Sequence, residues 1–482
     1  MTGTSMIIGL LIYVCILMFF GWYIPRKQSG GEDFLLGGRN VPFILVLGTT
    51  LATLVGTGST MGAVGSAYTN GWGGVLVGLG GALGFFVLTF VFVGARDHKF
   101  VTETEELAYY YDNNKPLKIL ISIMLTLGSI GWLGAHLLGG SSYLAHITGI
   151  DMNVARIIMA VCFAVYIVLG GYLAVVWTDT IQAFILFFGF AAMAFFSYHK
   201  VGGMEAISKA MDPAALSFLG IEKIGLIPAI STIVAIGTSP LAVPSYRQRI
   251  YSAKDTSTAK KAFLITSISF VFFSVFPAIV GMVAKVLNPD ITNANFVFPY
   301  MATSAFHPYI GLAILICGMS ATMSSGDSDA MTGTTILVND VYQLITGKAI
   351  PANRVVNFSK IVACGIIFVS LLFIWFANDV LGYIQTMIST LLSGVAVAGV
   401  FGRFWKRATW QGAIAAIVVA SGVSFFISSN KDLNAFWGGP IIPALICASI
   451  SLIIVSLITP KPKRSREEVL KEIVADREGM GL

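Results

Sequence analysis

Thirteen apolar runs, each long enough to cross a bilayer as one helix, follow one another along this chain of 482 residues. A spanning helix needs about 20 mainly apolar residues, because the bilayer core offers no water to bond to its backbone. Only 11% of the residues are charged, far below the ~25% of soluble domains. The sequence therefore predicts an all-α polytopic membrane protein. The predicted spans lie at roughly 5–24, 42–69, 73–94, 117–146, 152–170, 178–197, 224–246, 261–286, 308–343, 354–377, 381–402, 409–428 and 439–459.

The positions of the basic residues predict how these spans are oriented. With the N-terminus outside, most of the 30 Lys and Arg fall in cytoplasmic loops and in the C-terminal tail, as the positive-inside rule requires. An odd number of spans then places the C-terminus in the cytoplasm. We expect one transmembrane domain at 1–460, with a core at 42–402, and a basic cytoplasmic tail at 461–482. The expected location is the plasma or inner cell membrane.

Other function classes find little support in the sequence. A net charge of +6 would suit nucleic acid, but the basic residues are spread over the predicted loops, so no nucleic-acid partner is expected. The five cysteines lie in apolar runs without metal-ligand spacing, and no His-Glu-x-x-His motif occurs. An intramembrane enzyme is thus a much weaker alternative, and no obligate protein partner is inferred.

Spans 2 and 7 contain residues that interrupt helices. Gly56, Gly58 and Gly62 lie in the middle of span 2, and Pro240 and Pro244 lie in span 7. A bilayer tolerates the freed backbone groups only where they line a site. Spans 2–6 and 7–11 would then be two inverted repeats of five helices, each opening with a broken helix, as in secondary transporters. Close packing of glycine-rich helices is the alternative explanation.

A stripe of hydroxyl side chains runs along one face of the ninth span. Such a stripe is a candidate ligand set for Na+, and Asp327 and Asp329 flank it on opposite sides. Alternatively, the serines bond only to carbonyls one turn earlier in their own helix. We expect Asp329 to lie off the ion-facing side and to pair with another helix. The residues of the stripe recur at helical spacing: Ala321, Ser324, Ser325, Ser328 and Thr332.

Several short motifs, in a shared order and spacing, resemble the sodium:solute symporter family. That family includes bacterial proline, pantothenate and sialic acid symporters and animal glucose and choline cotransporters, and residues 323–328 and 341–343 look closest to its choline-transporter-like members. The resemblance covers most of spans 2–12 and implies a LeuT-type fold of 5+5 inverted repeats. The motifs are GGRNVP at 37–42, GSAYTNG at 65–71, GGYLAVVWTDTIQ at 170–182, QR at 248–249, MSSGDS at 323–328 and GRFWKRAT at 402–409.

The resemblance implies a principal sodium site between the break in span 2 and span 9. Its ligands would be the carbonyls of Ala52, Val55 and Ala321 and the hydroxyls of Ser324 and Ser325. A second sodium site, or a path for ion release, would use Ser328, Asp327 and Asp179. In that site Asp327 replaces a hydroxyl that some family members have. Asp179 could instead cap the helix of span 6.

The resemblance also implies a solute pocket between the two broken spans. Family members that transport glucose have glutamate and glutamine where this chain has Gly58 and Ser59, which disfavours a sugar. Choline transporters of the family have a tryptophan where this chain has Val243. The candidate pocket residues are Thr57, Gly58, Ser59, Trp132, His136, Thr238, Ser239, Tyr246 and Gln385.

We therefore expect a sodium-coupled secondary active symporter that imports a small organic solute by alternating access. An amino acid, a quaternary amine or another small zwitterion or cation is favoured over a sugar. The expected partners are Na+, the solute and the lipid bilayer. A proton-coupled symporter of the same fold is the alternative, because Asp179, Asp327, Asp329 and His136 are all titratable.

Overall fold

The computed structural model describes residues 3–23, 31–348, 350–375, 377 and 379–478. Within these ranges the chain is helical, and Val41 and Ala253 form an isolated bridge between two extended segments. The helices of the N-terminal half are α1 (Gly3–Tyr23), α2 (Gly31–Leu36), α3 (Phe43–Leu54), α4 (Ala63–Asn70), α5 (Val75–Val91), α6 (Glu103–Tyr110), α7 (Lys115–Thr148), α8 (Met152–Gly170), α9 (Tyr172–Lys200), α10 (Met204–Ala210), α11 (Ile221–Ile224) and α12 (Leu226–Thr238).

The C-terminal half continues this all-helical architecture. Its helices are α13 (Pro244–Ser252), α14 (Thr256–Phe273), α15 (Val275–Leu287), α16 (Val297–Ser304), α17 (Pro308–Ile336), α18 (Tyr342–Thr346), α19 (Ala352–Phe373), α20 (Val380–Met387), α21 (Ser393–Phe404), α22 (Trp410–Ser429), α23 (Lys431–Trp437), α24 (Ile441–Ile458) and α25 (Arg466–Glu478).

The prediction of a polytopic helical membrane protein is confirmed. Among the described residues, nine helices are long and apolar enough to cross a membrane, and ten if the bent pair Leu226–Leu241 and Pro244–Ser252 counts as one span. Three shorter apolar helices cover Ile8–Phe20, Phe43–Leu54 and Met152–Val168. The count of thirteen spans stays a prediction. Residues 24 and 376, at the ends of two predicted spans, lie outside the described residues, as do residues 479–482 of the predicted tail.

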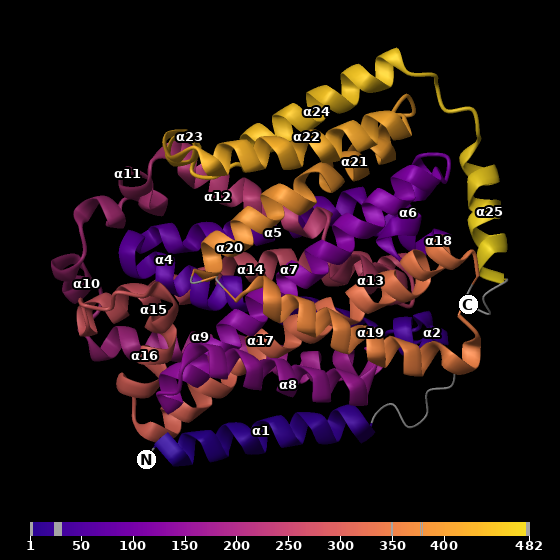
Figure 1. Cartoon of the computed structure of the whole chain (residues 1–482). Coiled ribbons are helices and arrows are strands. Elements are labelled where there is room, and N and C mark those ends of the chain that lie inside the picture. Colours follow the sequence, from indigo (N-terminus) through magenta and orange to yellow (C-terminus); the bar gives the residue numbers. More distant parts are fainter. Residues whose placement is uncertain (1–2, 24–30, 349, 376, 378, 479–482) are drawn as a thin grey trace.

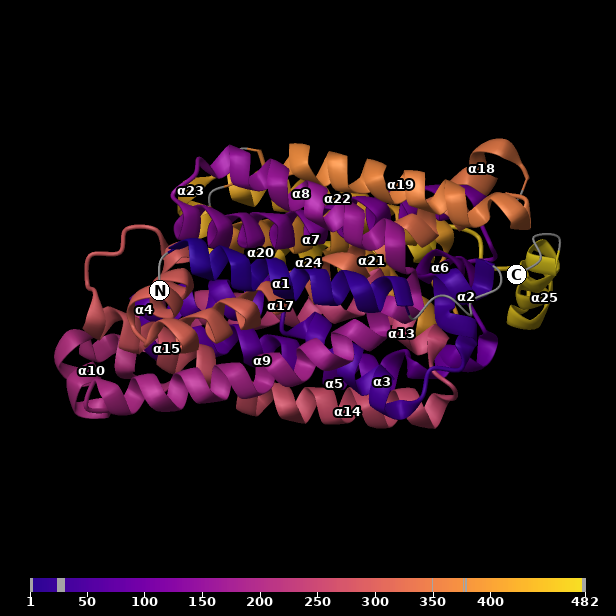
Figure 2. The ribbon, with the colours of Figure 1, turned by 90° about the horizontal axis from the view of Figure 1, so that it is seen from below.

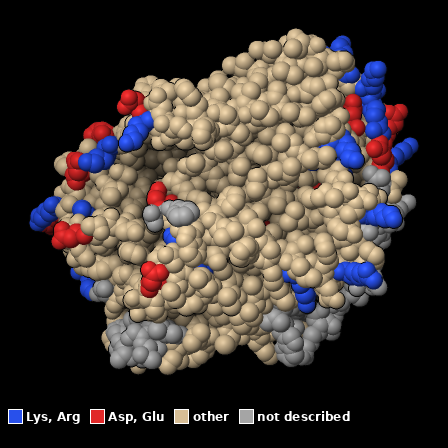
Figure 3. Space-filling model, in the orientation of Figure 1, with Lys and Arg blue, Asp and Glu red and all other residues tan. Residues whose placement is uncertain are grey.

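The long helices run roughly parallel to one another, from left to right in Figure 1. The N-terminal helix α1 lies along one edge of the bundle, and α22 and α24 lie along the opposite edge (Figure 1). On the face seen in Figure 3, acidic and basic side chains gather at the two ends, and a broad uncharged band separates them. A hydrocarbon layer matches this band, since charged groups are costly to bury in it. Helix α1 begins at one charged end, and α25 lies at the other (Figure 1).

Helix α17, which carries the predicted hydroxyl stripe, lies at the centre of the bundle. It packs against α7, α9 and α3, and both ribbon views place it inside the surrounding helices (Figures 1 and 2). Residues 320–335 of this helix are all buried. The polar side chains of α17 therefore face protein rather than lipid, which removes most of the cost of placing them in a membrane.

Both predicted helix interruptions are present. Helix α3 ends at Leu54, Val55 has a non-helical ψ of 55°, and the chain resumes through a widened π-helical turn at Gly58–Gly62. In span 7, α12 ends at Thr238, and α13 begins at Pro244 after a bend of 42°. Proline at the start of α13 has no N–H to leave unsatisfied, which suits it to the first turn of a helix.

The predicted tail forms the helix α25 at one end of the bundle (Figure 1). Arg466 at its start donates from Nη2 to the carbonyl of Gly402 at 2.7 Å. Its guanidinium also lies 5.3 Å from the ring centre of Tyr110 in α6. These contacts attach the tail to the transmembrane bundle.

Candidate functional site

The hydroxyls of α17 meet the break in span 2. The Oγ of Ser324 donates to the carbonyl of Ala52 at 3.1 Å, and the Oγ of Ser325 donates to the carbonyl of Thr53 at 2.9 Å. Neutral oxygens from two helices thus converge in a buried place, which is the kind of ligand set that coordinates Na+ in broken-helix transporters. Val55 directly follows α3, and Ala321 lies one turn before Ser324 and Ser325. Both are fully buried.

The hydroxyls also bond within their own helix, as the alternative explanation requires. The single hydroxyl hydrogen of Ser324 is shared between the carbonyl of Ala52 and that of Ser320, which lies 2.8 Å away; Ser328 donates to the carbonyl of Ser324 at 2.9 Å, and Thr332 to that of Ser328 at 2.7 Å. A hydroxyl that donates its hydrogen keeps two lone pairs. Bonding to a carbonyl one turn earlier is therefore compatible with coordination of an ion.

A glycine allows α17 to approach the break this closely. A Cβ atom added to Gly56 would lie 2.7 Å from the Oγ of Ser325 and 2.9 Å from the Cε1 of His136. Real Cβ atoms do not come this close to other heavy atoms. The interruption of span 2 thus depends on a residue without a side chain, as the close approach of its backbone to two other helices requires.

The residues of the predicted second ion site surround an arginine. The Nη2 of Arg249 lies 2.6 Å from the Oγ of Ser328, 2.9 Å from the Oγ1 of Thr49 and 3.3 Å from the Oδ2 of Asp179. Thr49 also donates to that carboxylate at 2.6 Å. In the structure, a cation that belongs to the protein therefore contacts both Ser328 and Asp179, whose side-chain oxygens lie 3.3 Å from each other. The third residue of the predicted site, Asp327, lies 3.4 Å from the Ser328 hydroxyl. A second sodium or an exit path at these residues stays a prediction.

Three expectations about charged residues need correction. Helix α9 begins at Tyr172, so Asp179 lies in its third turn and cannot cap the helix. The predicted end of span 7 at residue 246 places Arg247 and Arg249 in a cytoplasmic loop, but both are fully buried in α13. Arg249 is paired with Asp179, and Arg247 is paired with Glu106 at 3.1 Å. They pair because a buried charge without a partner would be very costly.

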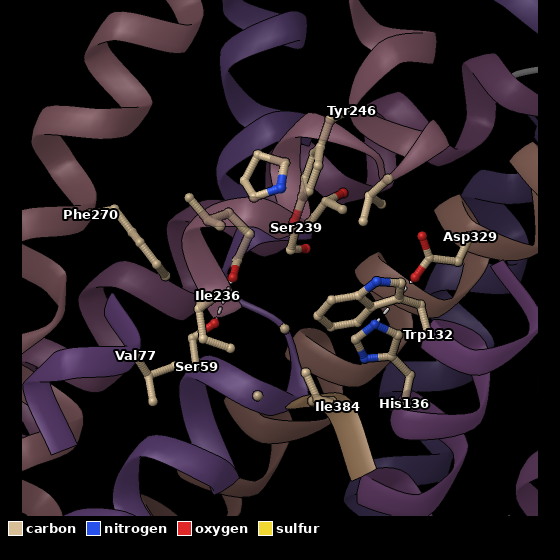
Figure 4. A pocket seen from close by; sticks show the side chains of 16 residues that line it. Ser59, Val77, Trp132, His136, Ile236, Ser239, Tyr246, Phe270, Asp329 and Ile384 are labelled. Carbon is tan, nitrogen blue, oxygen red and sulfur yellow. Dashed lines mark hydrogen bonds and ion pairs between the residues drawn. The ribbon is translucent and has the colours of Figure 1, made fainter. Parts of the chain in front are cut away.

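A pocket lies beside the ion site, between the two broken spans (Figure 4). Six of the predicted solute residues line it: Gly58, Ser59, Trp132, His136, Ser239 and Tyr246. Much of the remaining wall is apolar, since Leu54, Val77, Ile236, Pro240, Val243, Phe270 and Ile384 also line the pocket. Ser59 donates to the carbonyl of Leu54 at 2.6 Å, so its hydroxyl is held at the break.

The other three predicted solute residues lie outside this lining. Thr57 contacts the Nδ1 of His136 at 2.9 Å through its hydroxyl. Thr238 donates to the carbonyl of Val234 one turn earlier, at 2.7 Å. Gln385 donates to Thr232 at 3.4 Å, and its neighbour Ile384 faces the pocket instead.

Asp329 is the pocket residue that sequence reasoning placed elsewhere. It does pair with another helix, as expected, because its Oδ2 lies 3.4 Å from the Nε2 of His136 in α7. It also lines the solute pocket, next to Trp132 and His136 (Figure 4). The signal was present in the sequence: Asp329 follows Ser325 by four residues, so the two share a helix face.

The broken helices, the converging oxygens and the pocket between the broken spans are the features of a secondary transporter of the LeuT fold. A model of the sodium:solute symporter family matches residues 34–420, so the chain belongs to that family. The predicted family is thereby confirmed, the superposition with a solved symporter structure described below confirms the predicted fold, and the protein is a transporter rather than an enzyme. Membership supports sodium-coupled symport of a small solute by a multi-pass membrane protein.

Curated relatives and a solved structure match the chain over almost its full length. A sodium/pantothenate symporter of Haemophilus influenzae is 23% identical over 93% of this chain and 96% of its own. A sodium/proline symporter of Staphylococcus aureus is 25% identical over 97% and 95%. A substrate-bound, outward-open Na+-coupled sialic acid symporter superimposes with a TM-score of 0.78 at 21% identity, covering 95% of this chain and 99% of that one.

Proposed function

We propose that this protein imports a small organic solute together with Na+ by alternating access. The observation that carries the proposal is the convergence of the Ser324 and Ser325 hydroxyls on carbonyls at the break in span 2. A sodium ion placed among these oxygens would hold α17 and the broken span together beside the solute pocket. Binding of the ion would thereby favour the conformation that accepts the solute.

The membrane potential supplies part of the driving force. Inward movement of one positive charge across about 100 mV releases ~2.3 kcal/mol, before the concentration gradient of sodium is added. One ion per cycle is therefore enough to concentrate a solute. In our proposal the end of the bundle with α25 faces the cytoplasm and the N-terminus lies outside, as the placement of the basic residues indicates.

The proposed solute is an amino acid, a quaternary amine or another small zwitterion or cation. Small residues at Gly58 and Ser59, together with the largely apolar wall, offer few groups to bind the many hydroxyls of a sugar. Curated relatives are named as transporters of proline and of pantothenate. Both compounds belong in the first panel of solutes to be tested.

Proton coupling is the second candidate, and one observation favours it. The buried pair of His136 and Asp329 lies in the pocket and could take up a proton together with the solute. The two mechanisms differ in the gradient that they require. Labelled solutes should therefore be tested in proteoliposomes under an inward Na+ gradient and, separately, in Na+-free buffer under an inward proton gradient. Uptake that is equal in Na+-free buffer would overturn the sodium proposal.

Substitution of the two hydroxyls tests the site directly. The Ser324→Ala, Ser325→Ala double variant should bind Na+ roughly tenfold or more weakly, because two of its five proposed ligands are lost. The measurement is the Na+ concentration needed to stabilise the purified protein against heat, with K+ as the reference ion. Ser141→Ala is the matched control, since this buried serine of α7 donates to the carbonyl of Leu137 in its own helix. An unchanged Na+ requirement in the double variant would refute the assignment.

A further inference from the structure

The solute pocket contains one carboxylate and no fixed positive charge. Asp329 lines it and is 3% exposed, and no Lys or Arg occurs among the described residues of the lining. Removing an ionised carboxylate from water is costly unless a counter-charge and hydrogen bonds compensate. The electrostatics of the pocket therefore depend on what lies against Asp329.

The protein itself pairs Asp329 only in part. Within the described part of the chain, the one basic side chain near Asp329 is His136, whose Nε2 lies 3.4 Å from the carboxylate and carries a charge only when the imidazole is protonated. A strong charge-assisted hydrogen bond is shorter, about 2.7–2.9 Å. The other ring nitrogen of His136 contacts the hydroxyl of Thr57 at 2.9 Å, which holds the ring in place. The Oδ2 atom of Asp329 thus contacts His136, and the same carboxylate also lines the pocket (Figure 4).

The surroundings of Asp329 suit an organic cation. The indole of Trp132 lines the pocket beside the carboxylate and stacks on His136, with ring centres 6.1 Å apart (Figure 4). An indole face attracts cations. The opposite wall, which includes Ile236 and Phe270, would hold the carbon skeleton of a solute (Figure 4).

We propose, on the basis of the symport function above, that Asp329 binds a protonated primary or secondary amine of the solute. An N–H group would donate a charge-assisted hydrogen bond to the carboxylate, and this bond is stronger than one between neutral groups. A quaternary ammonium has no N–H to donate, so it would gain less. A solute with a carboxylate but no amine would add a second negative charge to the pocket. Asp329 is thereby the residue that selects for the amine.

A carboxylate on the same solute is tolerated but not required. The Nε1 of Trp132 is a buried donor with no hydrogen-bond partner among the described residues, so it is free to bind an oxygen of the solute. It is uncharged, however, and compensates a carboxylate less well than an arginine would. Simple amines and amino acids should therefore both bind.

The test is a set of ring solutes of similar size, measured by thermal stabilisation of the purified full-length protein in NaCl. Pyrrolidine has the ammonium alone, proline has both groups, N,N-dimethylpyrrolidinium is quaternary, and tetrahydrofuran-2-carboxylate has the carboxylate alone. Linear amines and amino acids extend the set. We expect stabilisation by members with an N–H ammonium, and at least tenfold weaker binding of these members to Asp329→Asn. The Thr334→Ala variant of the same helix, whose hydroxyl bonds to Ala330, should bind like the wild type.

The outcomes separate this inference from the sodium proposal. Stabilisation of Asp329→Asn by Na+ alone, at the wild-type concentration, shows that the variant is folded and its ion site intact. Equal solute binding in KCl would refute sodium coupling but leave the role of Asp329 standing. The inference is overturned by unchanged solute affinity in Asp329→Asn, by preference for the quaternary or carboxylate-only solute, or by a set in which no ammonium solute binds.

Discussion

At the scale of single residues, Arg249 is a buried charge that several neighbouring side chains compensate. Its guanidinium bonds to the hydroxyls of Thr49, Thr53 and Ser328 and lies 3.3 Å from Asp179, and all of these side chains are buried. The group connects α13, the second half of broken span 7, to α3, α9 and α17. A buried ion pair costs much desolvation to form, but it is even more costly to leave half of it unpaired.

The Arg249→Gln variant should lose about 3–5 kcal/mol of stability, because the Asp179 carboxylate then has no counter-charge. The double variant Arg249→Gln, Asp179→Asn should recover part of that loss, because no buried charge remains. Thermal unfolding of the purified proteins measures both effects. The exposed pair of Arg464 and Glu472 is the matched control, and Arg464→Gln should change stability by ~1 kcal/mol or less. A double variant no more stable than Arg249→Gln would contradict this account.

At the scale of helices, the break in span 2 is shaped by what packs against it. Gly56 lies where a side chain would collide with Ser325 of α17 and His136 of α7. Gly56 lies in the break between α3 and the turn at Gly58–Gly62, so the close approach of the neighbouring helices, rather than helix propensity, explains a residue without a side chain here. Gly56 also lines the solute pocket, so the same contact places the ion site next to that pocket.

Gly56→Ala should separate the break from α17 and weaken Na+ binding roughly tenfold, together with a loss of ~1–3 kcal/mol from overpacking. Gly365→Ala in α19 is the control, since a Cβ added there meets nothing within 4 Å. That variant should be neutral or slightly stabilising. Both effects are measured by heat denaturation at a series of Na+ concentrations. Equal Na+ requirements in the two variants would show that the close approach at Gly56 does not matter for the ion.

At the scale of the whole molecule, a buried charged cluster joins the second half of broken span 7 to α6, near the end of the bundle that carries α25 (Figure 1). Arg247 of α13 pairs with Glu106 of α6 at 3.1 Å and lies 3.7 Å from Glu103, and Tyr251 donates to Glu106 at 2.6 Å. Burial raises the pKa of the Glu103 carboxyl to about 8, although Arg247 opposes the rise. Glu103 is therefore mostly protonated at neutral pH, and the closer partner of Arg247 is Glu106.

This assignment predicts a dependence of stability on pH. Between the ordinary pKa of about 4.5 and the folded value of about 8, the folded protein keeps a proton on Glu103 that the unfolded chain has released. The contribution of the neutral carboxyl to the free energy of unfolding is therefore fully present below pH 4.5, and it is lost as the pH rises from there to about 8. Glu103→Gln, which stays neutral, should remove that part of the decline in Tm between pH 5 and 9. Glu106→Gln should destabilise across the whole range, because it leaves Arg247 without its partner. Parallel pH profiles for wild type and Glu103→Gln would contradict the assignment.

The sequence by itself determined the class of molecule and the positions of its breaks. Apolar runs must become buried or lipid-facing helices because a bilayer satisfies no backbone groups, and Pro244 cannot donate the backbone hydrogen bond that would continue a helix through it. The hydroxyls of Ser324 and Ser325 share a face by helical period, whatever packs against them. These features depend on local geometry, which the order of the residues determines.

Only the tertiary structure decided which groups meet. The burial of Arg249 beside Asp179, and the placement of Asp329 in the pocket next to Trp132, depend on helices that are distant in sequence. Spacing along α17 says which face a residue occupies but not which helix lies opposite. A charge on such a face becomes an ion-pair partner or a ligand group according to the neighbour that packing brings within a few ångströms, since electrostatic interactions depend on distance and burial.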